Sequence, residues 1–204
     1  SGKLENLRKD ARFYRINISS PRLAEIFKKE SITHVFHLAA KVSVEASLNN
    51  AFNDAMTNVM GSLNLLEQCR KHDVEKLVFA SSVAVYGEPR YLPVDENHDL
   101  KPISPYGCTK LAVEKYLYSY FINHGIRYVA LRLANVYGPR QRFDNEGGVV
   151  ARFIASLLLG ERPVIYGDGS QTRDFVYVRD VIKAFLLAMR KAKKAELNVA
   201  TCKE

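Results

Sequence analysis

Two linked motifs, F-A-S-S-V-A-V-Y-G at residues 79–87 and S-P-Y-G-C-T-K at residues 104–110, carry the strongest structural signal in this chain. The first is typical of a buried strand and its end, and the second of a helix start. Tyr106 and Lys110 are four residues apart and share one helix face. A cation near a phenol favours phenolate and lowers a pKa that is otherwise about 10. With Ser82 at the strand end, this arrangement would move a proton between an alcohol and a ketone.

On both sides of these motifs, short apolar runs alternate with helical patterns. Because the chain contains 11 tyrosines, a Tyr four residues before a Lys is also expected by chance, so the argument depends on this alternation. We expect strands at 12–18, 33–40, 76–81, 127–133, 163–166, 175–178 and 197–200, and helices at 21–30, 50–72, 105–123, 149–159 and 180–191.

This order is typical of βαβ units and predicts an α/β fold, a doubly wound parallel sheet of the Rossmann type. Ligands bind beyond the carboxyl ends of the strands in such sheets. The pair Ala39–Ala40 and the residues Ser82 and Asn135 each come at or just past such an end.

Composition says less about the class of protein, its location and its partners. No apolar run approaches the ~18–20 residues of a membrane span, and the N-terminal residues contain no apolar signal segment. The three cysteines are far apart in the sequence, which favours free thiols, no metal site and a cytoplasmic location. The net charge of +8 would suit nucleic acid, but the positive residues are scattered, and a basic cleft for a nucleotide explains them equally well.

In this order and spacing, the motifs resemble the extended short-chain dehydrogenase/reductases. The sequence is most similar to the NAD-dependent epimerase/dehydratase family and, within it, to UDP-glucose (UDP-galactose) 4-epimerases. Besides the two opening motifs, the resemblance rests on H-L-A-A-K-V-S-V at 37–44, N-V-M-G-S-L-N-L-L-E at 58–67, L-R-L-A-N-V-Y-G-P at 131–139, I-Y-G-D-G-S-Q-T-R-D-F-V-Y-V-R-D at 165–180 and N-V-A-T at 198–201.

The resemblance implies a partial NAD-binding Rossmann domain in residues 1–134 and a mixed region in residues 135–204 that binds substrate and returns to the sheet. Tyr106 would be the acid/base, Lys110 would lower its pKa and hold the nicotinamide ribose, and Ser82 would bind the reacting hydroxyl. The implied NAD-binding residues are Asn17, Ile18, Leu38, Ala39, Ala40, Lys41, Val42, Asn58 and Ala134. The implied nucleotide-sugar-binding residues are Asn135, Val164, Tyr166 and Arg173.

Several of these residues have a simpler interpretation. The planar fork of Arg173 suits a diphosphate, but this side chain could instead pair with Asp174 or Asp168 at the surface. Asn135 could be a turn former, and Asn58 could bond only to local backbone. His37 fits a hydrogen-bonded core residue better than a catalyst.

The sequence also departs from the family pattern. Asn17 stands where the family usually has Asp in its adenine-binding Asp-Ile pair. The resemblance implies that the chain begins beyond the glycine-rich pyrophosphate turn and stops before the C-terminal substrate-binding segment, so we expect weak NAD binding by this chain alone. Val83 and Ala84 occupy positions where the dehydratases have Asp-Glu, which favours epimerisation over dehydration.

The expected function is therefore NAD-dependent interconversion of UDP-glucose and UDP-galactose by transient oxidation at C4, in a homodimer paired through the helices at 50–72 and 105–123. One alternative is another activity on a nucleotide sugar (uronate epimerase, decarboxylase, reductase or dehydratase), for which residues 143–148 would help to set the choice. The other is a catalytically silent nucleotide- or RNA-binding protein.

Overall fold

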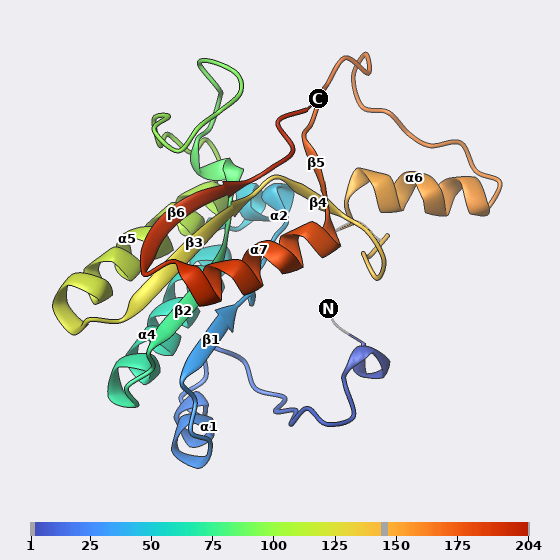
Figure 1. Cartoon of the computed structure of the whole chain (residues 1–204). Coiled ribbons are helices and arrows are strands. Elements are labelled where there is room, and N and C mark those ends of the chain that lie inside the picture. The colour runs from blue at the N-terminus through green and yellow to red at the C-terminus, as the bar shows by residue number, and fades with distance from the viewer. Residues whose placement is uncertain (1–2, 144–146, 204) are drawn as a thin grey trace.

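The centre of the molecule is a four-stranded parallel sheet with the strand order β1-β2-β3-β6 (Figure 1). The computed structural model describes residues 3–143 and 147–203. The sheet contains β1 (His34–His37), β2 (Lys76–Ser82), β3 (Arg127–Leu133) and β6 (Lys194–Val199), and a second parallel pair is formed by β4 (Asn135–Tyr137) and β5 (Phe175–Tyr177).

Helices cover both faces of the sheet (Figure 1). The described helices are α1 (Leu23–Lys29), α2 (Val44–Asn49), α3 (Ala51–Ala55), α4 (Gly61–Lys71), α5 (Pro105–His124), α6 (Val149–Leu158) and α7 (Val178–Lys191), with a π-helical turn at Met56–Met60 and 3-10 turns at Leu4–Asn6 and Val83–Val85. Helix α6 lies away from the sheet (Figure 1). No helix among the described residues combines the length and the apolar character needed to cross a bilayer.

The two central strands are apolar on both sides. In β2, Leu77 and Phe79 pack into a core with α1, α4 and α5, whereas Val78 packs into a second core with α7. Because successive strand residues point to opposite faces, burial on both faces requires the continuous apolar run that the sequence shows. The two cores fix where β2 ends, and therefore where Ser82 lies.

Helix α5 has strong signals at both ends. The Ser104 hydroxyl accepts a hydrogen bond from the Gly107 N–H at 3.1 Å, and Pro105 occupies the first turn. The helix ends at Gly125, which has φ 70 and closes it with a bond from its N–H to the Phe121 carbonyl. A positive φ is unstrained only for glycine-like residues, so the sequence itself sets this boundary.

Three expected elements differ in the structure. Residues 12–17 and 161–166 are irregular rather than strands. Near the first of these segments, Arg12 and Tyr14 each bond to Glu30 at 2.5 Å. The expected helix at 50–72 is interrupted by the π-helical turn, a feature that often marks functional sites.

Candidate active site

The end of β2 and the start of α5 bring Ser82, Tyr106 and Lys110 together. The Ser82 hydroxyl interacts with the Tyr106 phenol in the direction that lowers the pKa of Tyr106. The Lys110 ammonium donates to the Ala80 carbonyl at 2.8 Å and lies 5.6 Å from the centroid of the Tyr106 ring. Lys110 is only 3% exposed, so its charge is held inside the protein. The three residues predicted to act together therefore do lie together in the fold. Their catalytic roles stay predictions.

Burial controls the electrostatics of this cluster. It raises the pKa of Tyr106, with the hydrogen bond from Ser82 acting in the opposite direction and the charge of Asp54 adding to the rise. Burial also lowers the pKa of Lys110 to about 8, and Asp54 opposes this change. The pKa of Tyr106 is raised rather than lowered as predicted, because burial, the largest cause, disfavours phenolate.

Asn58 holds the loop that follows β1. Its side-chain oxygen accepts from the Lys41 N–H at 2.8 Å, and its side-chain nitrogen donates to the Lys41 carbonyl at 3.0 Å. These two bonds fix the backbone between Leu38 and Val42, whose side chains are 60% and 54% exposed. The backbone partner of the Asn58 side chain is therefore Lys41, 17 residues away in the sequence, and not the local backbone of its own helix. The role of Asn58 toward a cofactor stays a prediction.

Asn17 and Ile18 lie beside the start of α4. The Asn64 side chain donates to the Ile18 carbonyl at 2.6 Å, and the Asn17 side chain accepts from the Ser19 N–H at 2.9 Å. A Cβ on Gly61 would lie 2.7 Å from Ile18 Cδ1, so any larger residue here would have to displace the Ile18 side chain. Gly61 comes one helical turn after Asn58, which brings residues 17–18 and the Lys41 loop to the same stretch of helix.

His37 is part of the core. It is 3% exposed, and its Nε2 lies 2.7 Å from Ser62 Oγ. Burial lowers its pKa to about 3, and the charge of Lys110 contributes. A histidine that stays neutral and hydrogen-bonded fits the structural interpretation made from the sequence.

Another predicted cofactor residue, Ala134, directly follows β3. Its N–H donates to the Val199 carbonyl at 3.1 Å, and its side chain packs against the core beneath α7. This places Ala134 just past the end of the strand next to the one that ends at Ser82.

Two buried polar clusters were not predicted from the sequence. In the first, the Arg132 guanidinium forms two bonds to the Glu114 carboxylate, at 3.1 and 2.8 Å, and Ser81 donates to the same carboxylate at 2.5 Å. In the second, Asp54 bonds to Asn58 and Thr109. The spacing of these residues could have indicated the clusters, because residues four apart share a helix face. Glu114 follows Lys110 by four residues, and Asp54 precedes Asn58 by four.

A pocket of about 740 Å³ contains all four predicted substrate residues, Asn135, Val164, Tyr166 and Arg173, although 38 positions separate the first from the last in the sequence. The Asp174 carboxylate accepts bonds from Thr201 and Cys202 and the Asp168 carboxylate from Ser170, and among the described residues neither forms an ion pair with Arg173. Among the described residues, Arg173 therefore does not form the surface ion pair with Asp174 or Asp168 that was the alternative interpretation.

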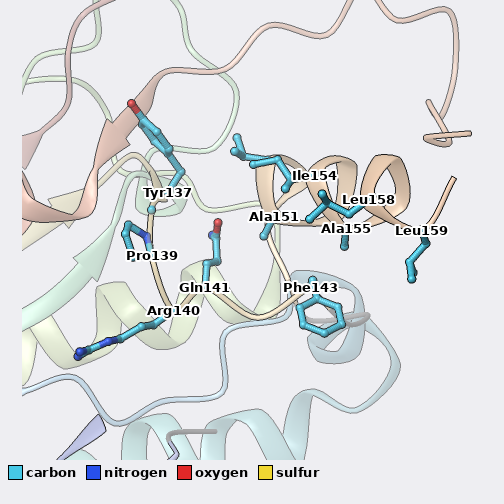
Figure 2. Close-up of a pocket in the computed structure, with 12 residues that line it drawn as sticks. Tyr137, Pro139, Arg140, Gln141, Phe143, Ala151, Ile154, Ala155, Leu158 and Leu159 are labelled. Atoms are coloured by element: carbon cyan, nitrogen blue, oxygen red, sulfur yellow. The ribbon is translucent and has the colours of Figure 1, made fainter. Parts of the chain in front are cut away.

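A second pocket, of about 630 Å³, is also lined by residues of α6 (Figure 2). Its walls are the loop from Tyr137 to Phe143 and apolar α6 side chains, including Ile154 and Leu158. Gln141 Oε1 is buried here without a hydrogen-bond partner among the described residues. The loop at 143–148 that was expected to influence sugar choice falls partly outside the description, because residues 144–146 are not described.

The residues at the ends of β1 and β2 fit the nicotinamide-ribose part of NAD. The Asn58-clamped loop presents exposed side chains, and a buried ammonium lies at the neighbouring strand end. An ammonium has three N–H donors, and the Ala80 carbonyl accepts one of them. The donor set therefore suits hydroxyl groups of a ribose.

Comparisons with known proteins give consistent matches. The model of the NAD dependent epimerase/dehydratase family matches residues 1–200. The chain is 46% identical over 205 residues to a putative UDP-glucose 4-epimerase of Methanocaldococcus jannaschii, a match that covers 100% of this chain and 67% of the relative. A human dTDP-D-glucose 4,6-dehydratase is 35% identical, with 86% of this chain and 49% of that protein covered.

Solved structures agree with the sequence matches. A UDP-glucose 4-epimerase of Thermotoga maritima with UDP-glucose has a TM-score of 0.97 at 44% identity and covers 100% of this chain and 67% of its own. The Thermus thermophilus UDP-glucose 4-epimerase in complex with NAD has a TM-score of 0.93 at 41% identity, with 98% and 67% covered. The predicted Rossmann-type α/β fold is confirmed, and the chain spans about two thirds of the length of these relatives.

Proposed function

Because this chain belongs to the NAD dependent epimerase/dehydratase family, whose cofactor is NAD, we propose that it carries the catalytic body of a nucleotide-sugar 4-epimerase acting on UDP-glucose and UDP-galactose. One observation carries the proposal: a proton-transfer cluster and a pocket with all four predicted substrate residues lie at neighbouring strand ends. Ser82 pairs with Leu133 in the sheet, and Asn135 of the pocket follows Leu133 by two residues.

In the proposed reaction, Tyr106 takes the proton of the sugar 4-hydroxyl and later returns it. Ser82 holds that hydroxyl with its own hydroxyl, the group that also favours phenolate at Tyr106. The charge of Lys110 stabilises the phenolate that forms, which matters because burial otherwise disfavours phenolate here. Bound NAD would supply the redox chemistry, accepting hydride from C4 and returning it to the other face.

The chain would hold the cofactor at Asn17–Ile18, along the Leu38–Val42 loop and by Lys110, with Ala134 near the nicotinamide. In the pocket of about 740 Å³, the exposed Arg173 would donate to the diphosphate, because a guanidinium fork suits paired oxyanions. Val164 and Tyr166, which are 62% and 71% exposed, would flank the nucleotide base.

Epimerisation is favoured over dehydration by the residues that follow Ser82. Val83 and Ala84 form a short 3-10 turn there and carry no carboxylate. Eliminating water requires a group that removes a proton from carbon and a group that protonates the leaving hydroxyl. The runner-up is 4-epimerisation of another nucleotide sugar, such as a UDP-uronate or an N-acetylated UDP-sugar.

We propose a homodimer on the evidence of an apolar surface. Along α2, α3 and the π-helical turn, the exposed residues include Leu48, Phe52 and Met60, which are 63%, 77% and 49% exposed, and α5 adds Ile122 at 58%. A surface of this kind is typical of a protein contact. A Phe52→Glu variant that still sedimented as a dimer would argue against this interface.

The free exposed thiols of Cys108 and Cys202 support a reducing, cytoplasmic location.

The test is an assay of UDP-glucose/UDP-galactose interconversion by the complete protein. Tyr106→Phe should lower kcat by about 10²–10⁴-fold, because it removes the proton carrier. Tyr118→Phe is the matched control, since Tyr118 lies on the same helix and is 46% exposed. Parent-like kcat in Tyr106→Phe would overturn the proposal.

A substrate panel separates the remaining alternatives. Faster turnover of UDP-glucuronate or UDP-N-acetylglucosamine would replace the proposed sugar, and faster turnover of dTDP-glucose would replace the proposed nucleotide. Salt-dependent retention of RNA, with no co-purifying NAD and no turnover, would favour the catalytically silent binding protein.

A further inference from the structure

A buried carboxylate, that of Asp54, lies between α3 and α5 and has no role in the reaction as described so far. Asp54 is 2% exposed. Its Oδ2 accepts from the Asn58 side chain at 3.1 Å and from the Thr109 hydroxyl at 3.2 Å. A buried ionisable group is costly unless it is hydrogen-bonded and paired with charge, so its presence calls for an explanation.

The two partners of Asp54 lead to the two parts of the candidate site. Asn58 clamps both backbone groups of Lys41 in the exposed loop after β1. Thr109 directly precedes Lys110, and its hydroxyl lies 2.8 Å from the Tyr106 carbonyl oxygen. The carboxylate therefore joins the loop at the end of β1 to the turn of α5 that carries Tyr106 and Lys110.

The charges around Asp54 have opposite sign to its own. Lys110 on α5 and Lys41 in the loop both favour the carboxylate form, whereas burial disfavours it. Tyr106 on α5 also feels the charge of Asp54. The neighbouring groups on the π-helical turn and on α5, Asn58 and Thr109, are neutral hydrogen-bond partners.

From β1, His37 faces Lys110 of this cluster. It is coupled to Lys110 and is neutral above a pKa of about 3. Asp54 is thus the negative charge that acts on both Tyr106 and Lys110.

We propose that Asp54 is a positioning residue that fixes α5 against the Lys41 loop and supplies the negative charge that keeps Lys110 protonated. Without this charge, burial would drive Lys110 toward the neutral amine, which could no longer stabilise phenolate at Tyr106. The effect on catalysis rests on the proposed function, but the effect on Lys110 does not.

The direct test follows Lys110 by NMR in the complete protein labelled with ¹³C,¹⁵N-lysine, with the signal assigned by its loss in Lys110→Met. The parent midpoint is expected at about pH 8. Asp54→Asn should lower that midpoint by about one pH unit, the size expected for losing one nearby opposite charge. Thr109→Val, which removes a hydrogen bond to the same carboxylate but no charge, should leave the midpoint in place.

Two further variants protect the test. Asp54→Glu restores the charge and should restore the midpoint, and Asp54→Ser is a second neutral variant if Asp54→Asn does not fold. An unmoved Lys110 midpoint in a folded neutral variant would overturn the proposal, as would an equal shift in Thr109→Val.

The pH profile of turnover gives the functional measurement. Because the charge of Asp54 raises the pKa of both Tyr106 and Lys110, its removal should move both limbs of the profile to lower pH. A purely structural role would lower the rate without moving the limbs. If the parent shows no epimerase activity, the proposed function fails, while the lysine titration still decides the role of Asp54.

Discussion

Helices α5 and α6 are predicted by the same kind of sequence pattern, yet the protein holds them in different ways. Helix α5 buries six residues, among them Lys110 and Glu114, and is capped at both ends. Helix α6 buries none of its ten residues, begins without a side-chain cap and exposes Leu158 at 82%. Tyr106 and Lys110 therefore lie on a helix, α5, that the core holds in place. The residues of the larger pocket lie beside α6, which the described chain covers on few sides (Figure 1).

The strongest way to break this contrast is to remove a buried charge beneath α5. Glu114→Gln leaves the Arg132 guanidinium, which is 3% exposed, without its anion, and should lower the free energy of unfolding by about 3–5 kcal/mol. Chemical denaturation followed by circular dichroism measures the change. The control is Asp180→Asn, which opens an exposed pair with Lys183 and should cost less than about 1 kcal/mol. Equal losses in the two variants would contradict the proposed difference between core and surface.

A matched pair of leucines sharpens the contrast without involving charge. Leu117 in α5 is 1% exposed, whereas Leu158 in α6 is 82% exposed. Leu117→Ala should lower the free energy of unfolding by about 2–5 kcal/mol, because it leaves a cavity, and Leu158→Ala should change it by less than about 0.5 kcal/mol. Thermal unfolding of the two variants under one buffer condition is sufficient. A large loss in Leu158→Ala would show that α6 is packed in solution.

The smallest expected effect is the change of folding stability with pH that buried His37 causes. Folding lowers the pKa of His37 to about 3, from about 6.5 in an unfolded chain. Its contribution is complete above pH 6.5 and declines as the pH falls, because only the unfolded chain then binds the proton. The loss should reach about 2 kcal/mol at pH 5.

Urea unfolding at pH 7 and pH 5 measures this loss. In His37→Gln, the difference between the two pH values should be smaller by that amount. His34→Gln, which alters an exposed histidine of the same strand, should keep the parent difference. An unchanged pH dependence in His37→Gln would remove His37 from this account.

Much of the molecule follows from local sequence. The strand at 127–133 and the helix from Pro105 match the structure closely, because each has a buried apolar run or strong capping residues. The predicted family is confirmed by the match over residues 1–200. The division at residue 134 into two regions stays a prediction, and β6 does return to the main sheet from the second of them.

The failures share one physical cause, which is that pairing and burial depend on contacts between distant residues. Residues 12–18 have the composition of a strand, but among the described residues no neighbouring strand accepts their hydrogen bonds, and Arg12 and Tyr14 bond to Glu30 instead. The pKa of Tyr106 could not be deduced from the spacing of Lys110 alone, because burial, which spacing does not encode, is the largest cause of its rise.

The sequence alone established the spacing of Tyr106 and Lys110, the position of Ser82 at a strand end and the order of the βαβ units. These features depend on helical and strand periodicity, which is local. The tertiary structure was needed to bring Asn135 and Arg173 into one pocket, and to place the carboxylate of Asp54 against α5. Both arrangements depend on how separate elements pack, and packing is set by contacts that no local pattern records.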